Sequence, residues 1–112
     1  MNRLFVIFLI LAIASCTKDT EDPMDDAKDC SSTTATYSGD IKAIIDGNCA
    51  TAGCHNGSTS LPVFDSFDGV FAKRSAIRSR VIAKTMPPSG KPDLSQAQID
   101  MIDCWVQNGA AE

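Results

Sequence analysis

An acidic segment without apolar periodicity, residues 17–35, limits how much of this chain can build a hydrophobic core. Its acids, opposed only by Lys18 and Lys28, are Asp19, Glu21, Asp22, Asp25, Asp26 and Asp29. Such a segment buries too little apolar surface to offset the entropy lost on ordering, so we expect a solvated tether. Residues 36–112 are left for one small domain, and a domain of that size usually needs a disulfide, a metal or a cofactor.

The N-terminal residues 1–15 have the features of an export signal. Arg3 precedes an apolar run over residues 4–14, which is short for a membrane span. Ile13-Ala14-Ser15-Cys16 resembles a bacterial lipobox, in which the cysteine receives diacylglycerol. We therefore predict a signal peptide over 1–15 and a lipidated Cys16 that begins a tether over 16–35. The alternative is a plain secretory signal with a chance cysteine.

The heptapeptide Cys49-Ala50-Thr51-Ala52-Gly53-Cys54-His55 contains the only histidine of the chain. Two thiols can form thioether bonds to the vinyl groups of a haem, and the adjacent imidazole can ligate its iron. The usual motif has two residues between the cysteines, whereas four separate them here, which gives C-x4-C-H. A covalent haem would also supply the additional core that a small domain needs.

A second motif, Thr85-Met86-Pro87-Pro88, presents a thioether sulfur from a restrained backbone. Pro87 keeps Met86 out of helical geometry, and Pro88 stiffens the loop. An isolated methionine is more often a filler of core gaps. Beside a cysteine–histidine haem motif, we interpret Met86 as the second axial ligand, because histidine–methionine ligation fills both axial positions and favours electron transfer.

Apolar periodicity predicts an all-α fold. One helix is expected to have Ser38 as its N-cap and to end at Gly47, just before the cysteines. A second helical face is expected over residues 76–84, after an aromatic-rich stretch. A third helix is expected to start with a capping box of Ser95 and Gln98, with Trp105 at its edge, and to stop at Asn108-Gly109. The apolar positions that define these elements are Ile41, Ile44, Ile45, Phe64, Phe67, Val70, Phe71, Ile77, Val81, Ile82, Ile99, Ile102 and Val106.

A helix entering the cysteine motif, a Met-Pro-Pro loop and a closing helix with an aromatic residue resemble a class I cytochrome c domain over about residues 37–110. The resemblance implies a small compact helical domain around one covalent haem c. In it Cys49 and Cys54 would hold the haem, with His55 as proximal and Met86 as distal ligand. The interval of 31 positions from His55 to Met86 is short for the family and requires a compact version of the fold.

Counting cysteines then predicts a disulfide. Of the five cysteines, Cys16 is assigned to lipid and Cys49 and Cys54 to haem, which leaves Cys30 and Cys104. In an exported protein this remaining pair can form a disulfide that pins the end of the tether to the last helix. The competing pairing joins Cys49 to Cys54, with no haem.

The function implied is that of a mono-haem electron carrier, not an enzyme by itself, although it could serve as a redox subunit of a larger one. Its partners would be a membrane, through the lipid on Cys16, and a redox protein with acidic surface. Two explanations are open for the positive charge of one segment: a solvated helix face, or a docking patch for the redox partner. The residues concerned are Lys73, Arg74, Arg78, Arg80 and Lys84. The lipid anchor and the net charge of -4 argue against nucleic acid.

The predicted signal and lipobox lead us to expect an exported bacterial lipoprotein, on the periplasmic side of the outer membrane or at the cell surface. Lys18-Asp19 with nearby acids resembles the export signals of surface lipoproteins in the Bacteroidetes group. Two other functions stay open: a disulfide-stapled surface lipoprotein that binds a ligand without haem, and a Cys/His metal-binding lipoprotein. Zinc would lack a fourth ligand from one histidine and two thiols.

Overall fold

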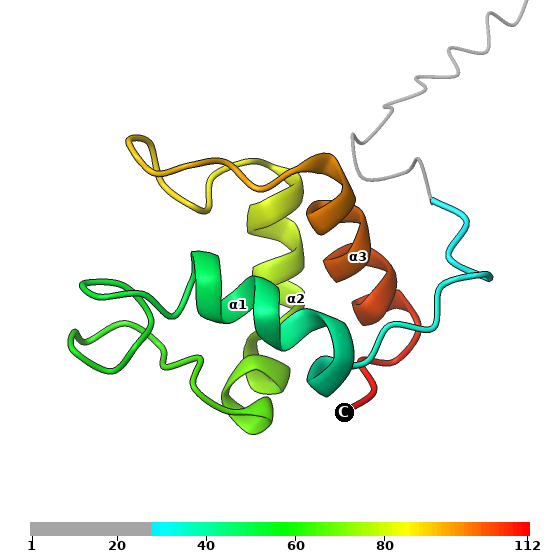
Figure 1. The fold of residues 1–112 in the computed structure, drawn as a ribbon, viewed down its shortest axis with the longest axis horizontal. Helices are drawn as coiled ribbons and strands as arrows, with labels where there is room; N and C mark the ends of the chain where they lie inside the picture. The colour runs from blue at the N-terminus through cyan, green and yellow to red at the C-terminus, as the bar shows by residue number, and fades with distance from the viewer. Residues whose placement is uncertain (1–27) are drawn as a thin grey trace, which may run out of the picture.

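Residues 28–112, which the computed structural model describes, form four helical elements (Figure 1). They are the π-helix η1 (Tyr37–Ile41), α1 (Lys42–Asn48), α2 (Phe67–Ile82) and α3 (Gln96–Gln107). This part of the chain contains no strand, so the prediction of an all-α fold is confirmed. The predicted signal peptide and the lipidated Cys16 lie outside the described residues.

The first helical segment, η1 followed directly by α1, has Thr36 as its N-cap and not Ser38 as predicted. The Thr36 hydroxyl accepts the Gly39 N–H at 3.0 Å, and the Asp40 carboxylate accepts the Thr36 N–H at 3.0 Å. These reciprocal bonds satisfy donors that the first turn of a helix leaves open. The carboxylate one turn after Thr36 favours that residue as the N-cap. The helix also continues past Gly47 to Asn48.

Helix α2 is one continuous helix that includes Phe67 and Phe71, two of the three aromatic residues expected to precede it, whereas Phe64 lies in the loop before it. Ser66 caps it by accepting the Gly69 N–H at 3.4 Å. A Cβ atom at position 69 would lie 2.5 Å from the Val63 carbonyl oxygen, so glycine allows the preceding loop to approach the helix. The helix ends at Ile82, short of the predicted Lys84, which has a positive φ of 55° in the following turn.

Helix α3 begins as the sequence predicts. The Ser95 hydroxyl accepts the Gln98 N–H at 3.2 Å, and the Gln98 side chain accepts the Ser95 N–H at 2.9 Å, so the capping box is confirmed. Gly109, with a φ of 96°, follows the helix end, as expected for a C-terminal stop. Trp105 was expected at the edge of this helix, but its side chain is fully buried in the core.

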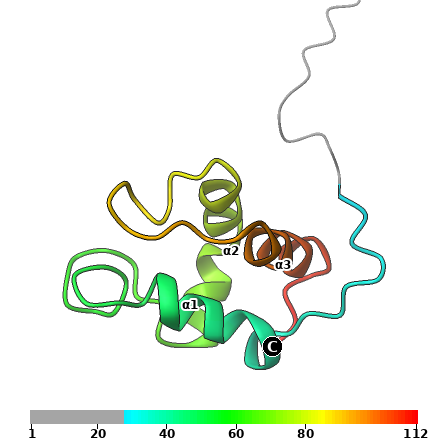
Figure 2. The same ribbon diagram turned by 45° about the horizontal axis from the view of Figure 1, so that its top comes forward.

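The hydrophobic core lies where α2 and α3 run side by side and the η1–α1 segment crosses them (Figures 1 and 2). Apolar side chains from every element meet there, so the chain builds a core from its own residues. Its members are Tyr37, Ile41, Ile45, Phe64, Val70, Ile77, Val81, Leu94, Ile99, Ile102, Trp105 and Ala110. Within residues 28–112, no helix is both long enough and apolar enough to cross a membrane.

The carbonyl oxygen of Ala111 ties the C-terminus to two core aromatics. It accepts the Tyr37 N–H at 2.8 Å and the Trp105 indole N–H at 2.8 Å. Tyr37 also packs against Phe67, with ring centroids 5.4 Å apart. The start of η1, the end of α3 and the C-terminal residues are therefore joined around one aromatic cluster.

The Tyr37 hydroxyl, buried in this cluster, makes no hydrogen bond within the part of the chain that the structure describes. Burial also raises the pKa of Tyr37. An unsatisfied buried polar group is destabilising, so Tyr37→Phe is expected to raise the free energy of unfolding by about 1 kcal/mol. Urea denaturation measures the change. Tyr37→Leu, which removes the ring contacts as well, is the destabilising control, and a loss of stability in Tyr37→Phe would contradict the prediction.

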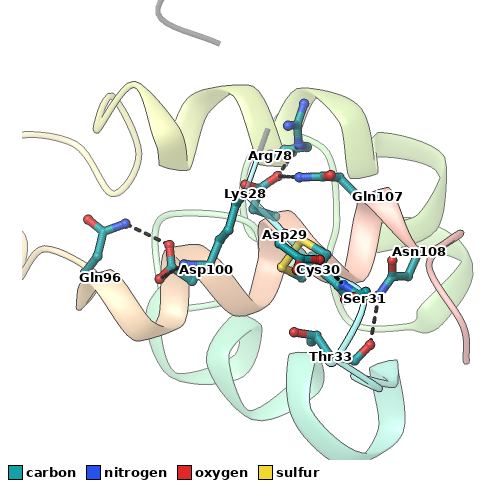
Figure 3. Close-up of a disulfide and its surroundings, with 12 residues drawn as sticks. Lys28, Asp29, Cys30, Ser31, Thr33, Arg78, Gln96, Asp100, Gln107 and Asn108 are labelled. Atoms are coloured by element: carbon teal, nitrogen blue, oxygen red, sulfur yellow. Dashed lines mark hydrogen bonds and ion pairs between the residues drawn. A yellow bond between two sulfur atoms is a disulfide. The ribbon is translucent and has the colours of Figure 1, made fainter. Parts of the chain in front are cut away.

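A disulfide joins the segment before η1 to α3 (Figure 3). The Cα atoms of Cys30 and Cys104 are 5.1 Å apart, within the range that a disulfide bridges, so this predicted pairing is present. The Asn108 amide donates to the carbonyl oxygens of Cys30 at 3.1 Å and Thr33 at 2.8 Å. The last residues of the predicted tether, 28–35, therefore lie against the folded domain.

A salt bridge joins the same segment to α3 one turn before Cys104, nearer the N-terminal end of the helix (Figure 3). The Lys28 ammonium lies 2.6 Å from the Asp100 carboxylate, and its hydrogen bond lowers the pKa of Asp100. Both side chains are partly exposed, so the pair contributes little by itself. Together with the disulfide it sets the direction in which residues 28–30 cross α3.

Candidate functional site

The predicted haem motif forms one hydrogen-bonded loop at the end of α1. Cys49 is the C-cap residue of α1, and its N–H donates to the Ile45 carbonyl at 2.8 Å. The chain then turns back, so that the His55 N–H donates to the Cys49 carbonyl at 3.1 Å. Gly53, with a φ of 78°, supplies the backbone conformation needed within the four-residue spacer. The wider cysteine spacing is thus accommodated in a closed turn.

The longer loop after His55 is closed by two bonds at its base. The Phe64 N–H donates to the His55 carbonyl at 2.9 Å, and the His55 Nδ1 lies 2.7 Å from the Pro62 carbonyl oxygen. The Thr59 hydroxyl donates to the Cys54 carbonyl at 3.0 Å within the loop. Cys49, Cys54 and His55 are therefore brought together by local backbone bonds, without a contribution from α3.

The bond from Nδ1 determines the tautomer of the neutral His55 imidazole. A carbonyl oxygen can only accept a hydrogen bond, so Nδ1 must carry the proton. In the neutral ring Nε2 then has an in-plane lone pair. Histidines that ligate metals almost always donate their other ring N–H to a carbonyl, a carboxylate or water, which fixes the ring and raises its basicity. The contact with Pro62 thus leaves Nε2 as the nitrogen of His55 with a free lone pair.

The aromatic ring of Phe64 lies against the His55 imidazole. The two centroids are 4.2 Å apart and the planes differ by 15°, which is a stacked arrangement. Phe64 itself is 6% exposed and belongs to the hydrophobic core. The imidazole is therefore held by a hydrogen bond at its edge and by a buried ring on its face.

The thiols of Cys49 and Cys54 are both free, so the competing Cys49–Cys54 pairing is not formed. Cys49 packs against the hydrophobic core. Burial, with a smaller contribution from the neighbouring Cys54, raises the pKa of its thiol to about 11. Cys49 is thus a protonated, half-buried thiol at neutral pH.

Slow alkylation of Cys49 by iodoacetamide is the expected consequence, because the thiolate is the reacting species. In a Cys54→Ser variant, the rate should rise about tenfold per pH unit between pH 8 and 10, below the raised pKa. Peptide mass spectrometry after timed quenching measures this rate, with the urea-unfolded variant as control. A rate at pH 8 equal to that of the unfolded chain would contradict the burial of Cys49.

Met86 lies on the other long loop, which joins α2 to α3. The Thr85 and Met86 N–H groups donate to the Arg80 carbonyl at 3.0 and 3.4 Å, and the Met86–Pro87 peptide bond is cis. Met86 is half-buried and lies outside the hydrophobic core cluster, whereas Met101 packs against that cluster from α3. The loop with Met86 and the loop with His55 project from the same side of the helices in both views (Figures 1 and 2).

The five basic residues of residues 73–84 do not form one uniform patch. Arg78 pairs with Asp103 on α3, with Nε 2.5 Å from the carboxylate. The Arg74 guanidinium lies 3.9 Å from the centre of the Phe71 ring. Only Lys73, Arg80 and Lys84 are exposed, so internal contacts account for part of the charge.

Two residues that position the His55 ring, Pro62 and Phe64, were not among the predicted site residues. Pro62 acts through its backbone carbonyl, which carries no side-chain signal. Phe64 has the same pattern as other core aromatics. Among residues 28–112, no group of three or more His, Cys, Asp or Glu side chains is arranged to hold a metal ion.

Comparison of the chain with protein-family models, with curated proteins and with solved structures finds no match.

Proposed function

We propose that this chain is a membrane-tethered mono-haem c-type cytochrome that carries single electrons. Cys49 and Cys54 would hold one haem c, with His55 as proximal and Met86 as distal ligand. The helical domain would be a compact version of a class I cytochrome c domain. A lipid on Cys16 would anchor it to a membrane of an exporting bacterium, at the outer membrane or the cell surface.

The observation that carries the proposal is the state of His55 beside two free thiols. Its Nδ1–H donates to the Pro62 carbonyl at 2.7 Å, which leaves Nε2 as the ligating nitrogen. Cys49 and Cys54 on the same loop retain their thiols for thioether bonds. A core histidine that served only for packing would need neither the ligating tautomer nor two unpaired cysteines beside it.

When bound, haem supplies an iron that alternates between the ferric and ferrous states. The chain would hold this group through Cys49, Cys54, His55 and Met86. His55 is oriented by Pro62 and Phe64. Met86 is presented by a loop whose backbone is tied to the end of α2. The loops with His55 and Met86 extend on the same side of the helices (Figures 1 and 2).

The other two functions receive less support. A haem-free binding module is favoured by the Cys30–Cys104 disulfide and by a core built without a cofactor. A haem-free binding module does not explain why the Nδ1–H of His55 is bound to Pro62 and Nε2 is left free. A Cys/His metal-binding protein has no arranged ligand group among the described residues.

The decisive experiment expresses the full chain together with a c-type haem attachment system. We expect an intact mass increased by one haem, no alkylation at Cys49 or Cys54, and a low-spin absorption spectrum. A Cys49→Ser/Cys54→Ser double variant, which keeps the Cys30–Cys104 disulfide, is the matched control and should carry no haem. A folded mature protein with two alkylatable thiols and no added mass would refute the proposal and favour the haem-free module.

A further inference from the structure

Phe64 is the residue that most tightly restricts the His55 ring apart from its hydrogen bond. The Phe64 backbone N–H donates to the His55 carbonyl at 2.9 Å, while its ring stacks on the imidazole with centroids 4.2 Å apart. One residue thus holds both the backbone and the side chain of His55. Being 6% exposed, Phe64 is itself held by the core.

The stacked geometry is compatible with ligation. The Nε2 lone pair lies in the plane of the imidazole, whereas Phe64 covers a face, so the lone pair is not blocked. A hydrogen bond through Nδ1 alone permits the ring to swing about the Nδ1–O axis. A flat ring packed against its face opposes that swing, because rotation would drive the imidazole into Phe64 or open a gap beside it.

We propose that Phe64 is a positioning residue that sets the plane of the His55 imidazole and preserves its Nδ1–H tautomer. The proposal rests on the proposed function in naming the haem iron as the atom that Nε2 addresses. The orienting action itself belongs to the haem-free chain, where it can be measured separately. Phe64 lies three residues before α2 and packs in the core, so its ring restrains the His55 imidazole relative to the helices.

Phe67 provides a matched control on the same segment. Its ring contacts Tyr37 and Phe71, at 5.4 and 5.2 Å between centroids, and neither partner belongs to the Cys-His loop. Phe64→Leu and Phe67→Leu make the same chemical change. Only the first removes the planar face that lies on His55, so a difference between them reports the stacking and not a general loss of core volume.

The first measurement uses the haem-free protein and NMR of isotopically labelled His55 at pH about 8, where an ordinary histidine is neutral. In the unmutated protein we expect the Nδ1–H tautomer and shielding of the imidazole protons by the Phe64 ring. Phe64→Leu should lose the shielding and show a mixture of tautomers, whereas Phe67→Leu should keep both signatures. Phe64→Tyr, which retains a planar ring, should restore them. Unshifted imidazole protons in the unmutated protein would overturn the proposal even if no Phe64 variant folds.

The second measurement uses the haem-loaded protein. Phe64→Leu should keep both thioether bonds by mass but change the pattern of the hyperfine-shifted haem methyl resonances, which depends on the plane of the axial imidazole. An identical pattern in Phe64→Leu and the unmutated protein would overturn the positioning role. If the unmutated chain takes up no haem but shows the ordered imidazole, the proposed function fails while the orienting contact stands.

Discussion

Removing the Cys30–Cys104 disulfide is expected to lower the free energy of unfolding by about 4 kcal/mol, the chain-entropy value for a long closed loop. The two cysteines are 74 positions apart, so the bridge restricts most of the folded domain in its unfolded state. Cys30 and Cys104 are also both buried, so a Cys30→Ala/Cys104→Ala variant loses some packing as well. Urea denaturation followed by circular dichroism measures the difference.

The control for that experiment is Cys49→Ala, which removes a cysteine that is not in the disulfide. Hydrogen exchange adds a local readout, since residues 28–35 are held to α3 mainly by the bridge and by Asn108. In the disulfide-free variant, the hydrogen-exchange protection of residues 28–35 should fall more than that of α2. A loss of less than about 1 kcal/mol, well below the chain-entropy value, would show that the bridge does not form in solution.

The second large effect concerns the two proposed axial ligands, which should fail differently when replaced. His55→Ala removes the proximal ligand and the motif read during attachment, so we expect roughly tenfold less haem-loaded protein or lower, by analogy with the loss of ligand support at metal sites. Met86→Ala should keep haem bound through Cys49 and Cys54. It should open the sixth position, lower the potential and let small ligands bind iron.

Haem content by mass, the absorption spectrum and potentiometric titration distinguish the two outcomes. Met101→Ala is the control, because Met101 packs against the core and lies within α3. It should reduce stability but leave the spectrum and the potential unchanged. A low-spin spectrum and unchanged potential in Met86→Ala would remove Met86 from the ligand set and make Met101 the next candidate.

Local sequence signals were sufficient wherever a few adjacent residues control the backbone. Ser95 and Gln98 fix the start of α3 because their reciprocal bonds involve only one turn. The isoleucines before Cys49 face the core with the helical period that the sequence shows. The disulfide followed from the cysteine count. The cytochrome c resemblance remains a proposal, because it depends on a bound haem, which a residue pattern alone does not demonstrate.

Tertiary structure decided the features that depend on residues distant in sequence or on backbone atoms. Thr36 and Ser38 both carry hydroxyls, and the distant bond of the Tyr37 N–H to the Ala111 carbonyl supports Thr36 as the cap, in addition to the local bond with Asp40. Trp105 is buried because η1 and the C-terminal residues cover it, which the periodicity of α3 cannot reveal.

The proposed ligand environment shows the same division. The sequence by itself determined that two thiols and one imidazole lie within a single short segment. Only the folded chain decided which nitrogen of His55 is available, because the Pro62 carbonyl and the Phe64 ring reach it through the closure of the loop. A backbone acceptor has no residue identity, and a stacked ring has the same composition as any core aromatic, so both depend on three-dimensional contact.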